Sequence, residues 1–187
     1  MKKILFLCLF SGLSMVVFSQ PADEASLQVN YPFTRLQLGF QLNQIQHDFG
    51  MGINVTSPRF FHRHVAIRLG ANVQWLQYIA PASLETNWKT YGVYKLGVNG
   101  ISGFITKSIM VYGEGGLVMM APNKKFSDKS LISGGYGLFG FEFIINKHFS
   151  YFIELGGMGT GAIAEKSLYK TVYANGFTTS VGIRKSF

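Results

Sequence analysis

The stretch from Val65 to Trp75, VAIRLGANVQW, is apolar at every second residue. From Arg68 onward the residues between them are arginine, glycine, asparagine and glutamine. Successive side chains of a β-strand point to opposite faces, so residues two apart share a face. The stretch therefore predicts a strand with one apolar face and one face that is polar or glycine.

The same alternation recurs seven more times along the chain. The further segments are 36–42, 49–55, 94–98, 111–119, 139–145, 151–155 and 177–187. Their opposite faces are again polar, charged or glycine, and the connections between them alternate broadly between short and long. That order is typical of an up-and-down meander with two distinct ends. We predict an all-β fold, an eight-stranded antiparallel up-and-down β-barrel.

The composition agrees with a β protein that lacks a charged outer surface. Charged residues make up 14% of the chain and aromatic residues 15%, and there are 22 glycines. An average soluble domain has about 25% charged residues. The formal charge of +8 includes no run of five like charges, so we expect no nucleic-acid partner.

The N-terminus has the pattern of an export signal. Lys2 and Lys3 precede an apolar stretch over 4–18, and small residues follow up to Ser19. The stretch is short for a membrane span and is interrupted by serine and glycine. We predict a signal peptide over 1–19 that is cleaved before Gln20.

Cleavage sets the expected domain organisation. It would remove Cys8, the only cysteine, and so exclude a disulfide, a thiol nucleophile and a cysteine metal site. We expect a periplasmic N-terminal segment over 20–33 and the barrel over 34–187.

Charge placement predicts which face of the barrel points outward. A soluble lipocalin-like barrel would turn the apolar face inward, whereas a transmembrane barrel would turn it toward lipid. Apart from Lys185, the apolar faces carry no charge. A lipid-facing Lys or Arg costs about 2–4 kcal/mol at the bilayer midplane and about 0–1 near the interface. Large rings at Phe139, Phe141 and Phe143 would also crowd an eight-stranded interior. We therefore predict a transmembrane barrel.

The last segment carries a more specific pattern, with Ser180 and Gly182 on one face and an aromatic residue at Phe187. With the eight segments, it resembles the small bacterial outer-membrane β-barrel family, porin-like and eight-stranded, over residues 34–187. The resemblance implies that these three residues form a C-terminal insertion signal read by the barrel-assembly machinery. It also implies an outer-membrane location, periplasmic termini and longer loops outside. Lys185 departs from the family pattern, which usually has an aromatic or aliphatic residue there.

The polar faces carry seven charged residues that would share the lumen. They are Arg35, Arg68, Lys95, Glu114, Glu142, Glu154 and Arg184. An unpaired charge in a narrow lumen is costly, so we predict an ion-pair network. Glu142 and Glu154 flank one turn and are expected to be direct cross-strand neighbours, with Arg184 or Lys95 between them. A gated pore or an acid–base carboxylate pair is the functional alternative.

Two sets of residues could indicate a lipid-modifying enzyme. His148 and Ser150 with Glu154 are similar to the site of lipid A deacylases, but His148 is predicted at the opposite, periplasmic end. The second set, similar to a palmitoyl-transfer site, is His47, Ser127 and Asp128. We expect neither to be catalytic and predict no enzyme.

No cofactor or metal site is predicted. Gly135, Gly137 and Gly140 have dinucleotide-binding spacing, but a strand follows where that motif needs a helix. His62 and His64 could share a strand face, yet no further ligand lies near them in the sequence.

The expected function is a non-enzymatic, monomeric, membrane-anchored scaffold or surface protein, with outer-membrane lipids as its surroundings. A small channel for ions or small solutes is the first alternative, and a lipid-modifying enzyme the second. The predicted outer loops are rich in lysine, at 124, 125, 129, 166 and 170. We interpret them as solvated loops, with contact to lipopolysaccharide phosphates as the alternative.

Overall fold

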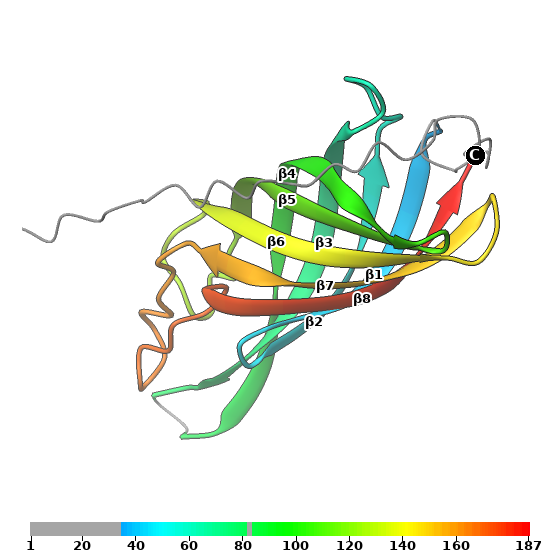
Figure 1. Ribbon diagram of the computed structural model, residues 1–187. Helices are drawn as coiled ribbons and strands as arrows, with labels where there is room; N and C mark the ends of the chain where they lie inside the picture. Colours follow the sequence, from blue (N-terminus) through cyan, green and yellow to red (C-terminus); the bar gives the residue numbers. More distant parts are fainter. Residues whose placement is uncertain (1–34, 82–83) are drawn as a thin grey trace, which may run out of the picture. The chain divides into compact units, whose positions relative to one another are not determined.

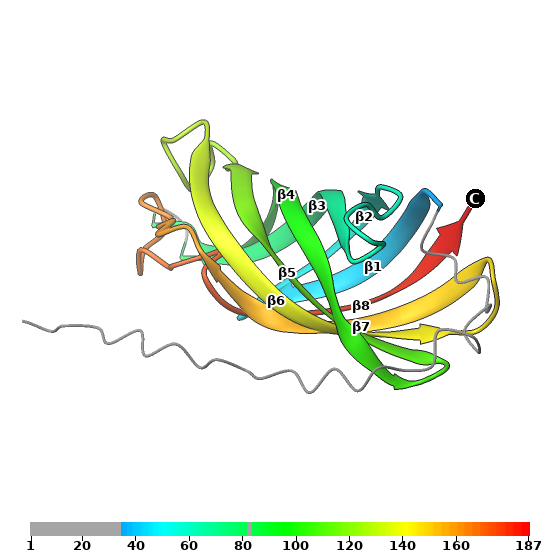
Figure 2. The same cartoon turned by 45° about the horizontal axis from the view of Figure 1, so that its top comes forward.

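The computed structural model describes residues 35–81 and 84–187 as an eight-stranded barrel. The strands are β1 (Gln37–Ile45), β2 (Asp48–Thr56), β3 (Val65–Ile79), β4 (Thr86–Thr106), β5 (Ile109–Ala121), β6 (Ile132–Ile144), β7 (Phe149–Gly159) and β8 (Gly176–Ser186). Each strand pairs antiparallel with the next, as Figures 1 and 2 show. The fold confirms the predicted up-and-down barrel. The predicted signal peptide and periplasmic segment lie outside the described residues.

Pairing of the first and last strands closes the barrel. β1 and β8 pair from Gln37 opposite Ser186 to Ile45 opposite Thr178. Every strand thus has a neighbour on both sides, and closure leaves a free outer edge only where the β3–β4 hairpin extends beyond Trp75 and before Gly92 in the described chain. In the described part of the chain, no helix is long and apolar enough to cross a membrane.

The third and fourth strands are longer than predicted. β3 continues to Ile79 and β4 begins at Thr86, so much of the expected loop between them is strand. After Gln74 the inward residues Leu76 and Tyr78 are apolar and the outward face includes the polar Gln77, which hides the two-residue period in the sequence. Near its other end β4 has register shifts against β5, between Ile101 and Gly103 and again before Thr106. These bulges accommodate its extra residues.

The two ends of the barrel differ, as Figure 1 shows. The turn end holds the connections 57–64, 107–108 and 145–148 together with the C-terminal end of β8. The loop end holds the connections 46–47, 80–85, 122–131 and 160–175. The connections therefore divide between the two ends as predicted, but their lengths do not separate completely, because 57–64 has eight residues, 80–85 has six and 46–47 has two.

The outer face is apolar on all eight strands. Its exposed side chains include Leu38, Phe40, Met51, Ile53, Ile67, Leu69, Leu96, Val98, Leu117, Met119, Phe139, Ile153, Leu155, Val181 and Ile183. Ring pairs lie on the same face, with Phe143 and Tyr151 stacked at 4.6 Å between centroids. In the eight strands, Lys185 is the one charged residue with outward parity. The structure therefore confirms that the apolar faces of the strands point outward.

The lumen is polar over only part of its length, which corrects the prediction of a polar lumen throughout. Toward the loop end it holds an apolar cluster, comprising Ile45, Leu76, Tyr78, Tyr91, Val93, Val118, Met120, Phe126, Ile132, Tyr136, Met158, Ala162, Ala164, Tyr173 and Ala174. Two loops contribute to it, because Phe126 and Tyr173 are buried with their rings 5.1 Å apart. We call this cluster the apolar cap.

Candidate functional site: the ion network of the lumen

The structure brings six of the seven predicted lumen charges to the inner wall. Each comes from a different strand: Arg68 (β3), Lys95 (β4), Glu114 (β5), Glu142 (β6), Glu154 (β7) and Arg184 (β8). They share the inward parity of their strands, opposite to the exposed apolar residues. Arg35 is the exception and corrects the prediction. It is exposed and precedes Gln37, where β1 begins, so the alternation no longer fixes its direction.

Arg184 holds two carboxylates at once. Its Nη1 lies 2.5 Å from Oε2 of Glu142, and its Nη2 lies 2.9 Å from Oε1 of Glu154. The Arg184 side chain is 0% exposed. Its guanidinium carbon also lies 3.9 Å from the ring centroid of Phe152. The arginine therefore separates two like charges that would otherwise repel each other.

The two glutamates are not direct cross-strand neighbours, which corrects the predicted register. Glu142 pairs with Phe152 and Glu154 pairs with Gly140. The β6–β7 hairpin is centred on Lys147, because Ile144 pairs with Ser150. The carboxylates are therefore diagonal, which leaves room for Arg184 to bind both.

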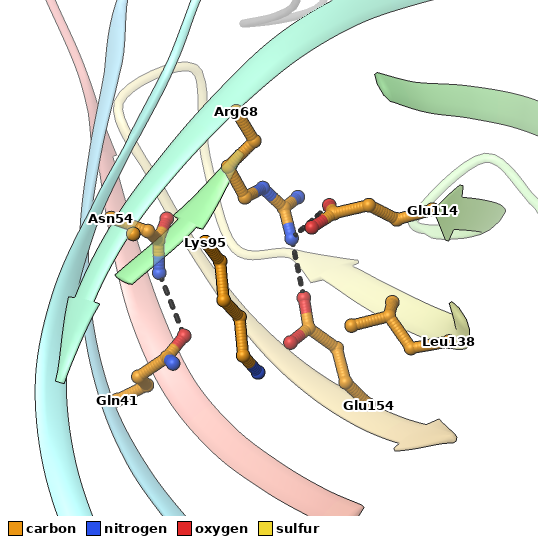
Figure 3. Close-up of a pocket in the computed structure, with 8 residues that line it drawn as sticks. Gln41, Asn54, Arg68, Lys95, Glu114, Leu138 and Glu154 are labelled. Atoms are coloured by element: carbon orange, nitrogen blue, oxygen red, sulfur yellow. Dashed lines mark hydrogen bonds and ion pairs between the residues drawn. The ribbon is translucent and has the colours of Figure 1, made fainter. Parts of the chain in front are cut away.

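Arg68 forms the second centre of the network, as Figure 3 shows. Its Nη1 lies 2.7 Å from Oε2 of Glu114 and 2.7 Å from Oε1 of Glu154. Its Nε donates a hydrogen bond to the hydroxyl of Thr56 at 3.0 Å. Glu154 consequently joins the two arginines, with one oxygen accepting from both.

Two tyrosines complete the network, although the sequence analysis assigned them no role. The Tyr112 hydroxyl donates to Oε1 of Glu154 at 2.6 Å and accepts from Nη2 of Arg184 at 3.0 Å. The Tyr136 hydroxyl donates to Oε1 of Glu114 at 2.7 Å. Hydrogen bonds that satisfy the remaining lone pairs are what make a buried ion pair tolerable. Both tyrosines occupy inward-facing positions in the alternation of their strands, so the sequence alone could have placed them in the lumen.

Arg59 is a further buried cation that the sequence analysis missed. It lies in the connection between β2 and β3 and donates from Nη2 to Oδ1 of Asn99 at 2.8 Å. Asn99 in turn donates to Oε2 of Glu114 at 3.2 Å. A turn has no side-chain period, so no sequence signal predicted that Arg59 would fold back into the barrel.

Amide side chains fill the lumen beside β1, β2 and β3. Gln41 and Asn43 both donate to Oδ1 of Asn72, at 2.7 and 2.8 Å. Asn54 donates to Oε1 of Gln41 at 2.9 Å, and Gln74 donates to Asn43. This side of the lumen is thus closed by hydrogen-bonded side chains rather than by charge.

Lys95 borders a small cavity at the centre of the network (Figure 3). Its Nζ lies 5.2 Å from the ring centroid of Tyr136. Among the described residues no carboxylate lies within 4.0 Å of that nitrogen. The cavity has a volume of about 10 Å³, which is room for roughly one water molecule. The lumen is therefore filled by side chains at this level.

The first candidate enzyme set does not form a nucleophile–base pair. The Ser150 hydroxyl donates to Oε1 of Glu142 at 2.5 Å. His148 lies at the turn end, where its Nδ1 is 3.4 Å from the carbonyl oxygen of Ser186. The serine is thus part of the ion network, and the histidine faces a backbone carbonyl.

The second candidate set ties two loops together. The Ser127 hydroxyl donates to Oε2 of Glu165 at 2.8 Å, and Asp128 forms an ion pair with Lys166 at 2.6 Å. No hydrogen bond or ion pair joins His47 to either residue in the described chain. The same residues contain no group of three His, Cys, Asp or Glu side chains that could hold a metal ion.

The residues of the predicted insertion signal have structural roles in the barrel. Ser180 is buried with inward parity, and Phe187 is exposed, its N–H donating to the carbonyl of Leu36 at 3.0 Å. A Cβ at Gly182 would collide with the Phe152 ring and the backbone of Phe40. Glycine is therefore required for packing at this position. Recognition by assembly machinery stays a prediction.

A closed eight-stranded barrel with an apolar exterior and an ion-paired interior has the fold of small outer-membrane β-barrels. Among solved structures, the chain is similar to the N-terminal β-barrel domain of Pseudomonas aeruginosa OprF. The TM-score is 0.58 at 11% identity, over 82% of this chain and 98% of that domain. Ail, the attachment invasion locus protein of Yersinia pestis, gives 0.47 at 10% identity, over 82% and 97%. No protein-family model and no curated protein matches the chain.

Proposed function

We propose that this chain is an integral outer-membrane protein whose sealed barrel anchors its loops at the cell surface, as a monomeric, non-enzymatic scaffold or surface protein. The apolar outer face supports membrane insertion, because exposed residues such as Ile53 (53%) and Leu117 (65%) would be unfavourable in water. Closure of the barrel lets neighbouring strands satisfy the hydrogen bonds of backbone N–H and C=O groups within the lipid. Outer-membrane lipids and the barrel-assembly machinery are the proposed partners, with the turn end in the periplasm.

The observation that carries the sealed barrel is the ion network centred on Arg184 and Arg68. Five charged side chains on five strands meet across the lumen at 2.5–2.9 Å. A conducting pore needs a continuous water path, which this network would interrupt. The apolar cap would close the lumen a second time, nearer the loops.

The loops support the scaffold part of the proposal. The backbone N–H of Lys166 donates to the carbonyl of Phe126 at 3.1 Å, and its Nζ donates to the carbonyl of Lys124 at 3.0 Å. With the Ser127–Glu165 hydrogen bond, these contacts join the β5–β6 and β7–β8 loops. Loops fixed to each other and to the cap would present one defined surface. Neither Ser127 nor Ser150 donates to the histidine of its candidate set in the described residues, which supports a non-enzymatic role.

Single-channel recording in planar bilayers tests the sealed barrel. We expect no steady conductance from the wild-type protein, and none from a Lys147→Ala control in an exposed turn. Glu154→Ala should weaken the network and produce brief openings at most. Steady wild-type conductance that rises in Glu154→Ala would instead establish the small channel.

Two further measurements test the remaining parts of the proposal. The folded protein should need detergent for extraction and should migrate differently on gels before and after boiling. A monomer that is soluble without detergent would overturn the membrane location. Turnover of labelled lipid A that is lost in His148→Ala or His47→Ala would overturn the non-enzymatic role.

A further inference from the structure

The exposed charged side chains at the turn end of the barrel are all basic in the described residues. They are Arg35, Arg63, Lys107, Lys147 and Lys185. No Asp or Glu side chain is exposed in the described residues of this end, since Glu142 is turned into the lumen and 0% exposed. The loop end differs, because Glu85, Asp128 and Glu165 are exposed there among its lysines. We call the five cations of the turn end the basic rim, and the loop end has no equivalent in the described residues.

Lys185 is distinct from the other four cations because it lies on the lipid-facing side of a strand. Its Nζ lies 5.0 Å from the ring centroid of Phe187 and 5.9 Å from that of Phe149. Two rings at this range attract an ammonium group through their faces. The aliphatic stem can stay among apolar side chains while the ammonium reaches the headgroup level.

An apolar groove continues from Lys185 along the outside of the barrel. It is lined mainly by Leu38, Phe40, Ile53, Phe149 and Ile183, from β1, β2, β7 and β8. Its volume is about 140 Å³. A cation at the end of an apolar groove matches an amphipathic ligand with a negative head and a hydrocarbon tail.

We propose that Lys185 and this groove bind one anionic phospholipid, with the basic rim as a weaker collar around the barrel. The inference rests on the proposed membrane location. The phosphate would contact the Lys185 ammonium, and an acyl chain would lie in the groove below. The groove favours a lipid over an acidic protein, because an acidic surface would bring no hydrocarbon to fill it.

A charge near an anionic membrane surface contributes about 1 kcal/mol of attraction, which is roughly fivefold in binding. Lys185→Gln should therefore weaken binding of phosphatidylglycerol about fivefold, whereas Lys185→Arg should keep it. The matched control is Lys125→Gln, which removes an exposed lysine from a loop at the other end. Removing three rim cations together, in Arg63→Gln/Lys107→Gln/Lys147→Gln, should lower total lipid uptake while leaving the tightest site occupied.

Native mass spectrometry of the detergent-solubilised full-length protein would count bound lipids during titration with phosphatidylglycerol or phosphatidylcholine. We expect one retained phosphatidylglycerol that is absent with phosphatidylcholine, and in Lys185→Gln the same occupancy should need about fivefold more phosphatidylglycerol. Equal retention of both lipids, or unchanged retention in Lys185→Gln, would overturn the proposal. Competition by inorganic phosphate alone would reassign the site to a free anion. Binding of a polyglutamate peptide without phosphatidylglycerol would reassign it to an acidic protein.

Gel mobility before and after boiling, run on each variant, separates this proposal from the membrane location. A variant that keeps the folded mobility but binds the lipid more weakly supports the site. A wild-type protein that shows folded mobility yet retains no anionic lipid refutes the site and leaves the barrel function standing.

Discussion

Replacing Arg184 with methionine should be among the most destabilising substitutions in the lumen. Methionine keeps an unbranched side chain against Phe152 but removes both ion pairs and the hydrogen bond to Tyr112. Removing one partner of a buried ion pair costs about 3–5 kcal/mol, because the other charge stays buried without compensation. We expect Arg184→Met to lower the free energy of unfolding by that amount.

The structure indicates where most of this cost arises. Glu154 would still accept hydrogen bonds from Arg68 and Tyr112, so its charge stays compensated. Among the hydrogen bonds named above for the described residues, Glu142 would keep that from the Ser150 hydroxyl, and the buried Arg59 would offset part of its charge. Replacing Glu142 with neutral glutamine removes the part of the cost that comes from its buried, uncompensated charge. The double variant Arg184→Met/Glu142→Gln should therefore recover about 2 kcal/mol relative to Arg184→Met, in the middle of the range for leaving a buried polar group unsatisfied.

Equilibrium unfolding by urea in lipid vesicles would measure these differences. The two tryptophans, Trp75 and Trp88, supply the fluorescence signal. Arg35→Met is the matched control, since Arg35 is exposed and should change stability by no more than about 0.5 kcal/mol. A loss below about 1 kcal/mol in Arg184→Met would refute the reasoning. So would a double variant no more stable than the single one.

Two further predictions concern packing and pH. Gly182→Ala should lower the free energy of unfolding by about 1–3 kcal/mol, because the added methyl group would overpack against Phe152. Gly113→Ala is the matched control, where a Cβ meets only ordinary contacts, and should cost less than about 1 kcal/mol. Unfolding by urea would compare the two variants. The hydrogen bond from Ser127 holds the pKa of Glu165 below its usual 4.5. The contact between the two loops is therefore fully present above pH 4.5. It is lost as the pH falls through the lowered pKa of Glu165 in the folded protein. Proteolysis of the β7–β8 loop should rise on acidification in the wild type, and Ser127→Ala should already be sensitive at neutral pH; a wild-type loop with no pH dependence contradicts this.

Side-chain period explains what the sequence could predict. A strand with different solvents on its two faces must alternate, so the eight segments and their outward faces could be identified without a structure. The period is hidden at the end of β3, where the inward residues Leu76 and Tyr78 are as apolar as the outward Trp75 and Ile79, and the outward Gln77 is polar. At the start of β4 the polar residues Thr86 and Thr90 share one face and Asn87 and Lys89 the other, so that end also shows no apolar alternation. The ends of both strands and the cap were missed for these reasons.

The side-chain alternation could not predict the strand register or the direction of turn residues. Centring the β6–β7 hairpin one residue too late shifts every pair by two, which makes Glu142 and Glu154 neighbours when they are diagonal. The error keeps every side chain on its correct face, so the hydrophobic pattern cannot detect it. Arg59 was missed because a turn residue has no periodic neighbours that would fix its direction.

The ion network supplies the register information that alternation lacks. A slip of one residue would move a strand's apolar side chains into the lumen and is strongly disfavoured, but a slip of two preserves the faces. Such a slip moves a side chain by about 6.6 Å along the strand. Arg184 reaches from β8 to Glu142 on β6, and Arg68 from β3 to Glu154 on β7, so both contacts join strands that are not paired. A shift of that size would separate each arginine from its carboxylates and leave the charges buried without partners. The cost that makes Arg184→Met destabilising is thus also the cost of closing the barrel in the wrong register.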